Sequence, residues 1–341
     1  MRKRILLVVL AFLMLAMSSC TLFDGLIDDE SSSGSSATSS STSDEIKHEH
    51  SFTKTVVPSI CDQKGYTRNI CACGYEYIDD FINPTAAHTF VRGICSTCGE
   101  ISFADILNLV STEAMKANVA VEAVYSNKGY AFSVEMGKSN GSGVIIDYSN
   151  GEYYFLTNNH VVYHKELADK SNQIKYYVTD YAGNKYLATL VLESARADYD
   201  LALLKFTSQD KYTVLDLEEG NKEIGNMVVS LGQPQGQPNT ITVGKITNYG
   251  RVKITGSDVT ECNVSFDTLH HDAYINSGSS GGALLDKELN VIGVNYAGAI
   301  KDDGTSEGSY AIPVEKIYEY FKLIGYEYEP FNNGQQSVPQ A

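Results

Sequence analysis

The stretch Gly278-Ser279-Ser280-Gly281-Gly282-Ala283-Leu284 places a serine on a glycine-rich turn just before an apolar segment. A turn of this kind can aim backbone N–H groups at the negative charge that develops on an attacked carbonyl oxygen. A serine hydroxyl alone is a weak nucleophile, because it needs an imidazole to accept its proton and a carboxylate to orient that imidazole. The stretch is therefore a candidate nucleophile loop, and the rest of the chain must supply the histidine and the acid.

Candidates for both partners lie upstream of the loop. His160 stands in Leu156-Thr157-Asn158-Asn159-His160-Val161-Val162, where an apolar strand runs into a polar turn. Asp200 immediately precedes the apolar run Leu201–Leu204. Taken one at a time, such a histidine or aspartate is usually a surface or turn residue, so the argument depends on their occurring together with the serine. Rival residues of the same types lie nearby: His164, His270, His271, Asp198 and Ser279.

With histidine, aspartate and serine in this order, the chain resembles the HtrA (Deg) branch of the trypsin-like serine proteases. The resemblance covers about residues 115–320. Its motifs follow one another at family-like spacing: Gly141–Ile146, Thr157–Val162, Asp200–Lys205, Leu231–Pro234, Asp272–Asn276, Val291–Asn295 and Tyr310–Pro313.

The resemblance implies an all-β fold of two six-stranded antiparallel barrels of chymotrypsin type, with the catalytic site in the cleft between them. It implies His160 as the general base, Asp200 as the residue that orients it and Ser280 as the nucleophile, with the N–H groups of Gly278 and Ser280 as the oxyanion hole. Ser280 is preferred over Ser279 because two glycines follow it, and Asp200 over Asp198 because a leucine follows it, as the family pattern requires.

Two further residues are assigned to the primary specificity pocket on the same resemblance, Tyr274 and Asn295. A preference for Lys or Arg in the substrate would need a buried negative charge in this pocket. Because Tyr274 stands six residues before the nucleophile in place of an acid, we expect a small-to-medium apolar residue before the cut bond. The nucleophile loop also lacks the proline and asparagine of the usual P-G-N-S-G-G, which predicts a looser loop.

The function expected from this resemblance is that of a serine endopeptidase that cleaves unfolded or surface polypeptides through an acyl-enzyme, without a catalytic cofactor. The alternative is a weak or inactive relative that acts as a binding module or adhesin. Only about 18 residues follow Leu323, too few for another domain, so we expect no C-terminal PDZ domain. The resemblance leaves the oligomeric state open, with a homotrimer among the options.

The first residues of the chain predict export. A basic start at Met1–Arg4 precedes an apolar run at Ile5–Ala16 and then Met17-Ser18-Ser19-Cys20, similar to a lipoprotein lipobox. The apolar run is shorter than the ~20 residues that span a bilayer. We therefore expect a signal peptide at residues 1–19 and a lipidated Cys20 that anchors an extracytoplasmic protein to a membrane. A net charge of −16 argues against nucleic acid as a partner.

Composition divides the remainder of the chain. Residues 20–47 are Ser-rich and acidic and predict a disordered tether. A Cys/His-rich module is expected over residues 48–100, the protease domain over 101–330, and a disordered polar tail over 331–341.

The Cys/His-rich module is similar to the ribbon segments of bacterial surface proteins. Its halves repeat, since His50-Ser51-Phe52 leads to Cys71-Ala72-Cys73-Gly74, and His88-Thr89-Phe90 leads to Cys95-Ser96-Thr97-Cys98-Gly99. Thiolate and imidazole groups at such spacing suit zinc. A module this small has little hydrophobic core and needs a staple, that is, a bound metal ion or disulfides that cross-link the chain. Disulfides are the alternative in an exported protein. Beside His48, the candidate zinc ligands are His50, Cys61, Cys71, Cys73, His88, Cys95 and Cys98, and which four form a site is open.

Secondary structure in the protease part is predicted from periodicity. Apolar residues at helical spacing predict a helix over Ser102–Asn118 and a closing helix over Val314–Leu323. Short runs rich in Val, Ile, Tyr and Thr, separated by turn residues, predict strands of a barrel or sandwich. These strands are expected at Val119–Tyr125, Tyr153–Thr157, Ile174–Val178, Tyr186–Leu192, Val228–Leu231 and Ile241–Thr247.

Overall fold

The structure is a computed structural model that describes residues 49–61, 63–84, 88–130, 132–233, 240–252, 260–300 and 306–331. The expected signal peptide, Cys20, the tether, His48 and nearly all of the tail lie outside the described residues. Within the described ranges, no helix combines the length and the apolar character needed to cross a membrane.

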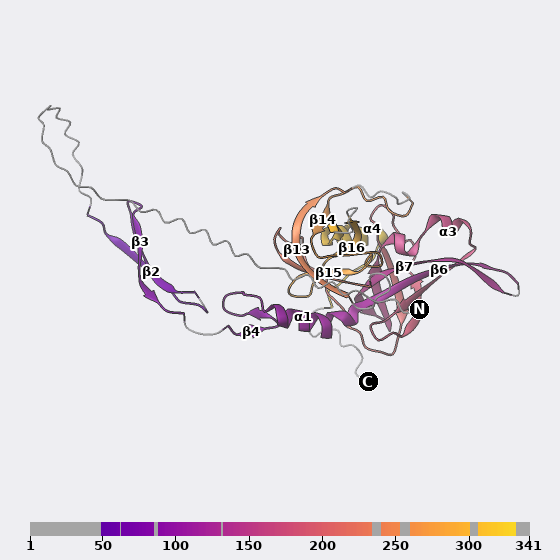
Figure 1. The fold of residues 1–341 in the computed structure, drawn as a ribbon, viewed down its shortest axis with the longest axis horizontal. Helices are drawn as coiled ribbons and strands as arrows, with labels where there is room; N and C mark the ends of the chain where they lie inside the picture. Colours follow the sequence, from indigo (N-terminus) through magenta and orange to yellow (C-terminus); the bar gives the residue numbers. More distant parts are fainter. Residues whose placement is uncertain are drawn as a thin grey trace, which may run out of the picture. The chain divides into compact units, whose positions relative to one another are not determined.

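The first barrel is closed, with its antiparallel strands in the order β10-β11-β8-β7-β6-β9. Its strands β6 and β7 are labelled in Figure 1. Closure leaves no unpaired sheet edge. Strand β7 is buried from Gly141 to Ile146, where it crosses the barrel, whereas its first half pairs with β6 in a hairpin that extends beyond the barrel. The strands are β6 (Asn118–Lys128), β7 (Ser133–Ser149), β8 (Glu152–Thr157), β9 (Gln173–Thr179), β10 (Lys185–Leu190) and β11 (Ala202–Thr207).

The second barrel is also closed, in the order β12-β13-β14-β17-β16-β15. Two closed six-stranded barrels confirm the predicted fold class. Each run predicted to be a strand overlaps an observed one, although the run at Tyr186–Leu192 outlasts β10 by two residues. The strands are β12 (Met227–Gly232), β13 (Thr240–Gly250), β14 (Thr268–His271), β15 (Ala283–Leu285), β16 (Val291–Ile300) and β17 (Ser306–Pro313).

Neighbouring residues of one strand belong to different cores. Val229 is part of a large buried cluster that also contains Phe155 and Leu203 of the first barrel. Val228 belongs instead to a smaller cluster within the second barrel, with Ile246 and others. Successive side chains of a strand point to opposite faces, so the second barrel can fill its own interior and also pack on the first.

Short helices flank the barrels: α1 (Phe103–Thr112), the 3₁₀ turn η1 (Ala114–Ala117), α2 (Asn159–Val162), α3 (Lys165–Asp169) and α4 (Val314–Ile324). The helix predicted over Ser102–Asn118 is observed as α1 followed by η1, with the Ser102 hydroxyl capping the first turn of α1. The closing helix is confirmed as α4, and its Tyr320 hydroxyl donates to the Ser194 carbonyl oxygen at 2.7 Å.

The described residues of the Cys/His-rich part form short strands. β1 (Phe52–Val57), β2 (Gly65–Cys71) and β3 (Glu76–Ile82) form a sheet in that order, and β4 (Phe90–Val91) pairs with β5 (Ile94–Cys95). Several large apolar side chains of β3 are exposed, including Phe81. So little buried apolar surface agrees with the expectation that this part needs a staple.

Candidate active site and metal-binding groups

Strand pairing brings His160 and Asp200 together. β8 ends at Thr157, and α2 with His160 follows within two residues; β11 begins at Ala202, just after Asp200. The two strands are antiparallel neighbours with Thr157 opposite Ala202, so the end of one meets the start of the other. Asp200 adopts a left-handed backbone conformation, with φ of 49°, that turns its side chain back to the end of β8.

The Asp200 carboxylate binds His160 at two points. Oδ2 lies 2.8 Å from His160 Nδ1, and Oδ1 accepts from the His160 backbone N–H at 3.0 Å. The carboxylate is fully buried, whereas the His160 side chain is 27% exposed. Burial by itself lowers the pKa of His160, but attraction and hydrogen bonding to Asp200 outweigh it, and the net effect is a raised pKa. The pair is thus an imidazole whose Nδ1–H is held by a buried anion.

The nucleophile loop is held by hydrogen bonds from its own strands and from β7. Gly281 donates to the Asn295 carbonyl oxygen at 2.8 Å, and Ser142 of β7 donates its backbone N–H to the Ser280 carbonyl oxygen at 2.7 Å. Gly281 has φ of 86°, and a Cβ there would stand 2.0 Å from the Ser142 carbonyl oxygen, so only glycine fits. These contacts fix the loop although its proline and asparagine are absent.

Two N–H groups of the loop remain available. Within the described parts of the chain, neither the Gly278 nor the Ser280 backbone N–H donates a hydrogen bond, while those of Ser279, Gly281 and Gly282 all do. An oxyanion hole requires such uncommitted donors near the nucleophile. The geometry is therefore compatible with the predicted pair of donors.

The two candidate serines face different ways. Ser279 is buried, and its Oγ accepts from the Asn276 backbone N–H at 3.3 Å. The Ser280 hydroxyl donates to the Tyr296 carbonyl oxygen at 3.4 Å and borders a pocket. It makes no hydrogen bond to His160; such bonds are often long before a substrate is present. Of the two hydroxyls, that of Ser280 is the one open to a substrate.

Residues 141–294 match the family described as trypsin-like peptidase domain. The periplasmic serine endoprotease DegP of Salmonella typhimurium is 35% identical over 178 residues, which are 52% of this chain and 34% of DegP. DegQ of Escherichia coli is 33% identical over 176 residues, 51% of this chain and 34% of DegQ. The chain carries an HtrA-like peptidase domain of trypsin type. It spans about a third of the length of these curated relatives.

A solved structure is similar to the HtrA-like domain as well. It is a variant of the HtrA-type protease AlgW with a decapeptide, 26% identical, with a TM-score of 0.50 over 64% of this chain and 67% of that one. The comparison agrees with the two-barrel fold and confirms the resemblance found in the sequence.

The pocket beside Ser280 has a volume of about 270 Å³ and differs from the one expected. It is lined by Ile275, Asn276, Ser277, Ser280, Ala297 and Gly298. Neither residue assigned from the resemblance lines it. Tyr274 is 42% exposed, and Asn295 is buried, with Nδ2 donating to Ser230 Oγ and the Ala283 carbonyl oxygen.

Ile275 lies within the Asp272–Asn276 motif but was not assigned to the pocket, and Ala297 and Gly298 lie two and three residues after the Val291–Asn295 motif. Strand alternation does not reveal the pocket position of Ala297 either. In a regular strand, the side chains of residues 295 and 297 would lie on the same face of β16. A register shift between Asn295 and Ala297 interrupts this alternation. Sequence motifs do not report such a bulge.

A second, larger hollow of about 580 Å³ borders the nucleophile loop of the HtrA-like domain. Ser277 and Gly278 line it together with Glu122 and Lys185. Lys185 Nζ lies 2.7 Å from a Glu122 carboxylate oxygen, and Lys138 Nζ lies 3.4 Å from the other. Although burial raises it, these lysines lower the pKa of Glu122 overall. This hollow is polar and charged, whereas the pocket beside Ser280 is lined by uncharged residues.

The expected metal ligands fall into two groups. In the first, one ligand atom from each of Cys61, His88, Cys95 and Cys98 lies within 4.8 Å of all the others. Cys98 Sγ is 3.3 Å from His88 Nδ1, and His88 Nε2 is 3.1 Å from a Glu100 carboxylate oxygen. Metal-binding histidines commonly donate their second ring N–H to a carboxylate in this way.

The second group consists of His50, Cys71 and Cys73, with Cys73 Sγ 3.3 Å from His50 Nδ1. Cys61, Cys95 and Cys98 of the first group are thiols and form no disulfide with one another. Backbone N–H groups of Cys98 and Thr97 lower the pKa of Cys95, which favours the thiolate that a metal binds. Three thiols and an imidazole are a donor set that fits tetrahedral zinc.

Proposed function

We propose that this chain is an extracytoplasmic serine endopeptidase that cleaves polypeptides with His160, Asp200 and Ser280. The observations that carry the proposal are the contact of 2.8 Å between His160 Nδ1 and the buried Asp200 carboxylate, and the pocket that Ser280 lines. A buried anion on Nδ1 selects the tautomer whose Nε2 can accept a proton. The relatives named periplasmic serine endoproteases support this function and this location.

The reaction begins when His160 Nε2 takes the proton of the Ser280 hydroxyl as Ser280 Oγ attacks the peptide carbonyl carbon. The N–H groups of Gly278 and Ser280 stabilise the oxyanion, and Asp200 stabilises the imidazolium. His160 then returns the proton to the leaving amine, which gives an acyl-enzyme on Ser280. A water molecule, deprotonated by His160, hydrolyses the acyl-enzyme and restores the serine.

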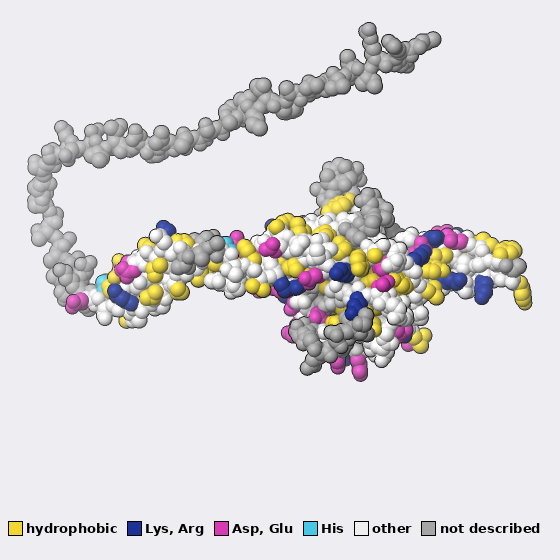
Figure 2. Space-filling model, turned by 90° about the horizontal axis from the view of Figure 1, so that it is seen from below, with side chains coloured by type: hydrophobic (Ala, Val, Ile, Leu, Met, Phe, Trp, Pro, Cys, Tyr) yellow, Lys and Arg dark blue, Asp and Glu magenta, His cyan; other side chains and the backbone are white. Residues whose placement is uncertain are grey.

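The pocket beside Ser280 supports a preference for small or medium apolar residues before the cut bond. Ile275 and Ala297 give it apolar walls, Gly298 leaves room, and none of the described residues that line it is acidic. A lysine or arginine side chain would be desolvated there without a counter-charge. Basic and acidic side chains are interspersed on the face seen in Figure 2. An unfolded polypeptide is the proposed substrate, and nucleic acid is not.

Incubation of the purified protein with unfolded casein, followed by mass spectrometry of the fragments, tests this function. We expect cuts after residues such as Val, Ala and Ile, and labelling of Ser280 by a serine-reactive phosphonate. If neither cleavage nor labelling occurs, the chain is an inactive relative that acts by binding.

A lipid on Cys20 would hold the enzyme at the outer face of a membrane. The support is the sequence of residues 1–20, with its basic start, short apolar run and small residues before the cysteine. Radioactive palmitate should label the protein in cells, and Cys20→Ser should remove the label and release the protein from the membrane fraction. A labelled Cys20→Ser protein would refute the anchor.

The Cys/His-rich part is proposed to bind zinc as a structural staple. The first group, Cys61, His88, Cys95 and Cys98, has the number and type of ligands of a closed structural site, with Glu100 oriented on His88. The second group, His50, Cys71 and Cys73, offers three ligands and is more exposed. Neither group includes a residue of the proposed triad, so zinc has no part in the cleavage reaction.

A further inference from the structure

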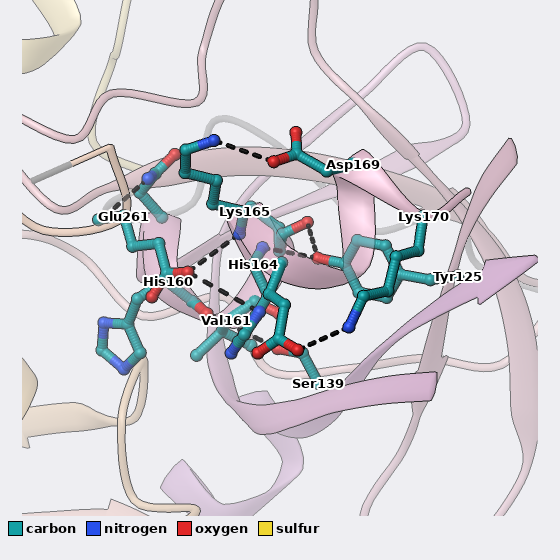
Figure 3. Close-up of polar contacts among 12 residues, drawn as sticks. Tyr125, Ser139, His160, Val161, His164, Lys165, Asp169, Lys170 and Glu261 are labelled. Carbon is teal, nitrogen blue, oxygen red and sulfur yellow. Dashed lines mark hydrogen bonds and ion pairs between the residues drawn. The ribbon is translucent and has the colours of Figure 1, made fainter. Parts of the chain in front are cut away.

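Glu261 reaches across from the second barrel to the segment that carries His160. It belongs to the loop between β13 and β14, and one oxygen of its carboxylate accepts the Lys165 backbone N–H at 2.8 Å and lies 3.6 Å from His164 Nδ1 (Figure 3). Its own carbonyl oxygen accepts from Asn159 Nδ2 at 2.6 Å. Asn159 immediately precedes His160, and Lys165 begins α3, so Glu261 binds the chain on both sides of the base.

The first barrel holds the same segment from the other direction. Ser139 of β7 donates to the Val161 carbonyl oxygen at 2.5 Å, and the Tyr125 hydroxyl of β6 accepts the His164 backbone N–H at 2.8 Å (Figure 3). Ser280, however, belongs to the second barrel. The distance from base to nucleophile therefore depends on contacts between the barrels, and Glu261 supplies such contacts directly at the base.

The residues after Glu261 continue toward the acid. Asn263 donates its backbone N–H to the Ala197 carbonyl oxygen at 2.7 Å, and the same oxygen accepts the Asp200 backbone N–H at 3.3 Å. Cys262 lies between Glu261 and Asn263. Burial and the Asp200 carboxylate raise the pKa of its thiol to about 12, so this thiol stays protonated beside Asp200. The segment Glu261–Asn263 thus contacts the surroundings of both His160 and Asp200.

We propose that Glu261 is a positioning residue of the catalytic site: it fixes the His160 segment from the second barrel and holds a second carboxylate within electrostatic reach of the base. This inference rests on the serine-peptidase function proposed above. Glu261 does not touch the reacting atoms; it acts through Asn159, Lys165 and the field at His160.

The charge of Glu261 raises the pKa of His160, as the charge of Asp200 does. Its side chain is only 13% exposed, so solvent screens it less than a surface charge. Burial lowers the pKa of His160, attraction and hydrogen bonding to Asp200 raise it, and Glu261 adds to the rise. His164 faces the Glu261 carboxylate as well, and the Lys165 ammonium pairs with Asp169 at 2.8 Å. Of the two carboxylates that raise the pKa of His160, Glu261 is the one that can be changed without altering the triad.

Three variants of the full protein test the proposal, with cleavage of a peptide substrate measured across pH. Glu261→Gln keeps an oxygen for the Lys165 N–H and loses the charge; we expect the acid limb of kcat/KM to move to lower pH with little change at the optimum. Glu261→Ala also loses the hydrogen bond, and kcat should fall about tenfold with KM nearly unchanged. Glu261→Asp retains the charge and should keep the limb near its wild-type position.

Glu223→Gln is the matched control, because Glu223 is an exposed carboxylate of the second barrel and its loss changes the net charge equally. If the acid limb of the kcat/KM profile lies at the same pH in Glu261→Gln as in Glu223→Gln, the proposal is overturned, even if Glu261→Gln is less stable. If Glu261→Gln does not fold, a Glu261→Ala protein with an unchanged kcat and an acid limb at the wild-type position has the same consequence. An inactive wild-type protein would instead refute the proposed function.

Discussion

The Ser142 hydroxyl donates a hydrogen bond of 2.7 Å to the carbonyl oxygen of Gly278, and so connects the first barrel to the candidate nucleophile loop of the second. The same hydroxyl accepts the Gln233 backbone N–H at 2.9 Å, and the Ser142 side chain is fully buried. The peptide that this bond holds is the one after Gly278, so the orientation of the proposed oxyanion donors depends on it. Ser142 lies in the Gly141–Ile146 motif, where no sequence pattern marks it as part of a site.

Replacing Ser142 by alanine should therefore weaken catalysis and stability together. The Gly278 oxygen and the Gln233 N–H, both of partly buried residues, would lose their partner, which costs about 1–3 kcal/mol. We expect kcat/KM to fall by about tenfold to a hundredfold through kcat, as the oxyanion donors lose their alignment. Peptide kinetics and thermal unfolding measure the two effects. Ser133→Ala, at an exposed position of the same strand, is the control and should change neither.

The adjacent serines should differ sharply on substitution. Ser280→Ala removes the nucleophile and should lower kcat by at least about a thousandfold. Ser279→Ala removes only an acceptor for the Asn276 N–H, so most of the activity should remain. Cleavage of casein and labelling by a phosphonate, located by mass spectrometry, distinguish the two. Label found on Ser279 would contradict the assignment.

Cleavage should rise with pH through the titration of His160. Because its pKa is raised above the ordinary 6.5, His160 remains protonated, and so unable to act as a base, to a higher pH than an ordinary histidine. The sign for stability follows: the raised pKa stabilises the folded state below pH 6.5, and that contribution is lost as the pH rises through the folded value. Asp200→Asn should move the acid limb down and reduce kcat by about 10⁴-fold. An unmoved limb would assign the titration to another group.

His271 should make the fold sensitive to acid. This side chain is 1% exposed in β14, and burial lowers its pKa to about 4. The unfolded chain therefore binds a proton below pH 6.5 that the folded chain refuses, so stability falls from that pH down to about 4, by on the order of 3 kcal/mol. His271→Gln should flatten this part of the stability profile in urea unfolding. The exposed control Lys211→Gln should leave it unchanged.

Metal analysis should find at least one zinc per chain in protein purified without reduction. Cys95→Ser removes a ligand of the four-residue group and should lose one equivalent, whereas Cys262→Ser, outside both groups, should lose none. A chelator should remove the zinc and leave peptide cleavage largely intact, because no triad residue is a ligand. Cysteines joined in disulfides, with no metal present, would replace zinc with an oxidised staple.

Short motifs, through their resemblance to the HtrA proteases, were enough to predict the two barrels and the candidate triad. His160 and Asp200 each lie at the end of an apolar strand, and Ser280 precedes two glycines, so every signal is contained in a few consecutive residues. Local patterns of this kind express turn chemistry and strand ends, which do not depend on distant parts of the chain. The predicted strands agree with the barrels for the same reason.

Only the tertiary structure decided which distant residues meet. The division of the ligands into Cys61 with His88, Cys95 and Cys98, and His50 with Cys71 and Cys73, departs from the sequence halves, because Cys61 precedes the second half-repeat. The bulge after Asn295 accompanies the placement of Ala297 in the pocket. Glu261 contacts the His160 segment at Lys165, which is 96 residues away in the sequence. Such contacts arise from barrel closure and barrel packing, and no local pattern of residues records them.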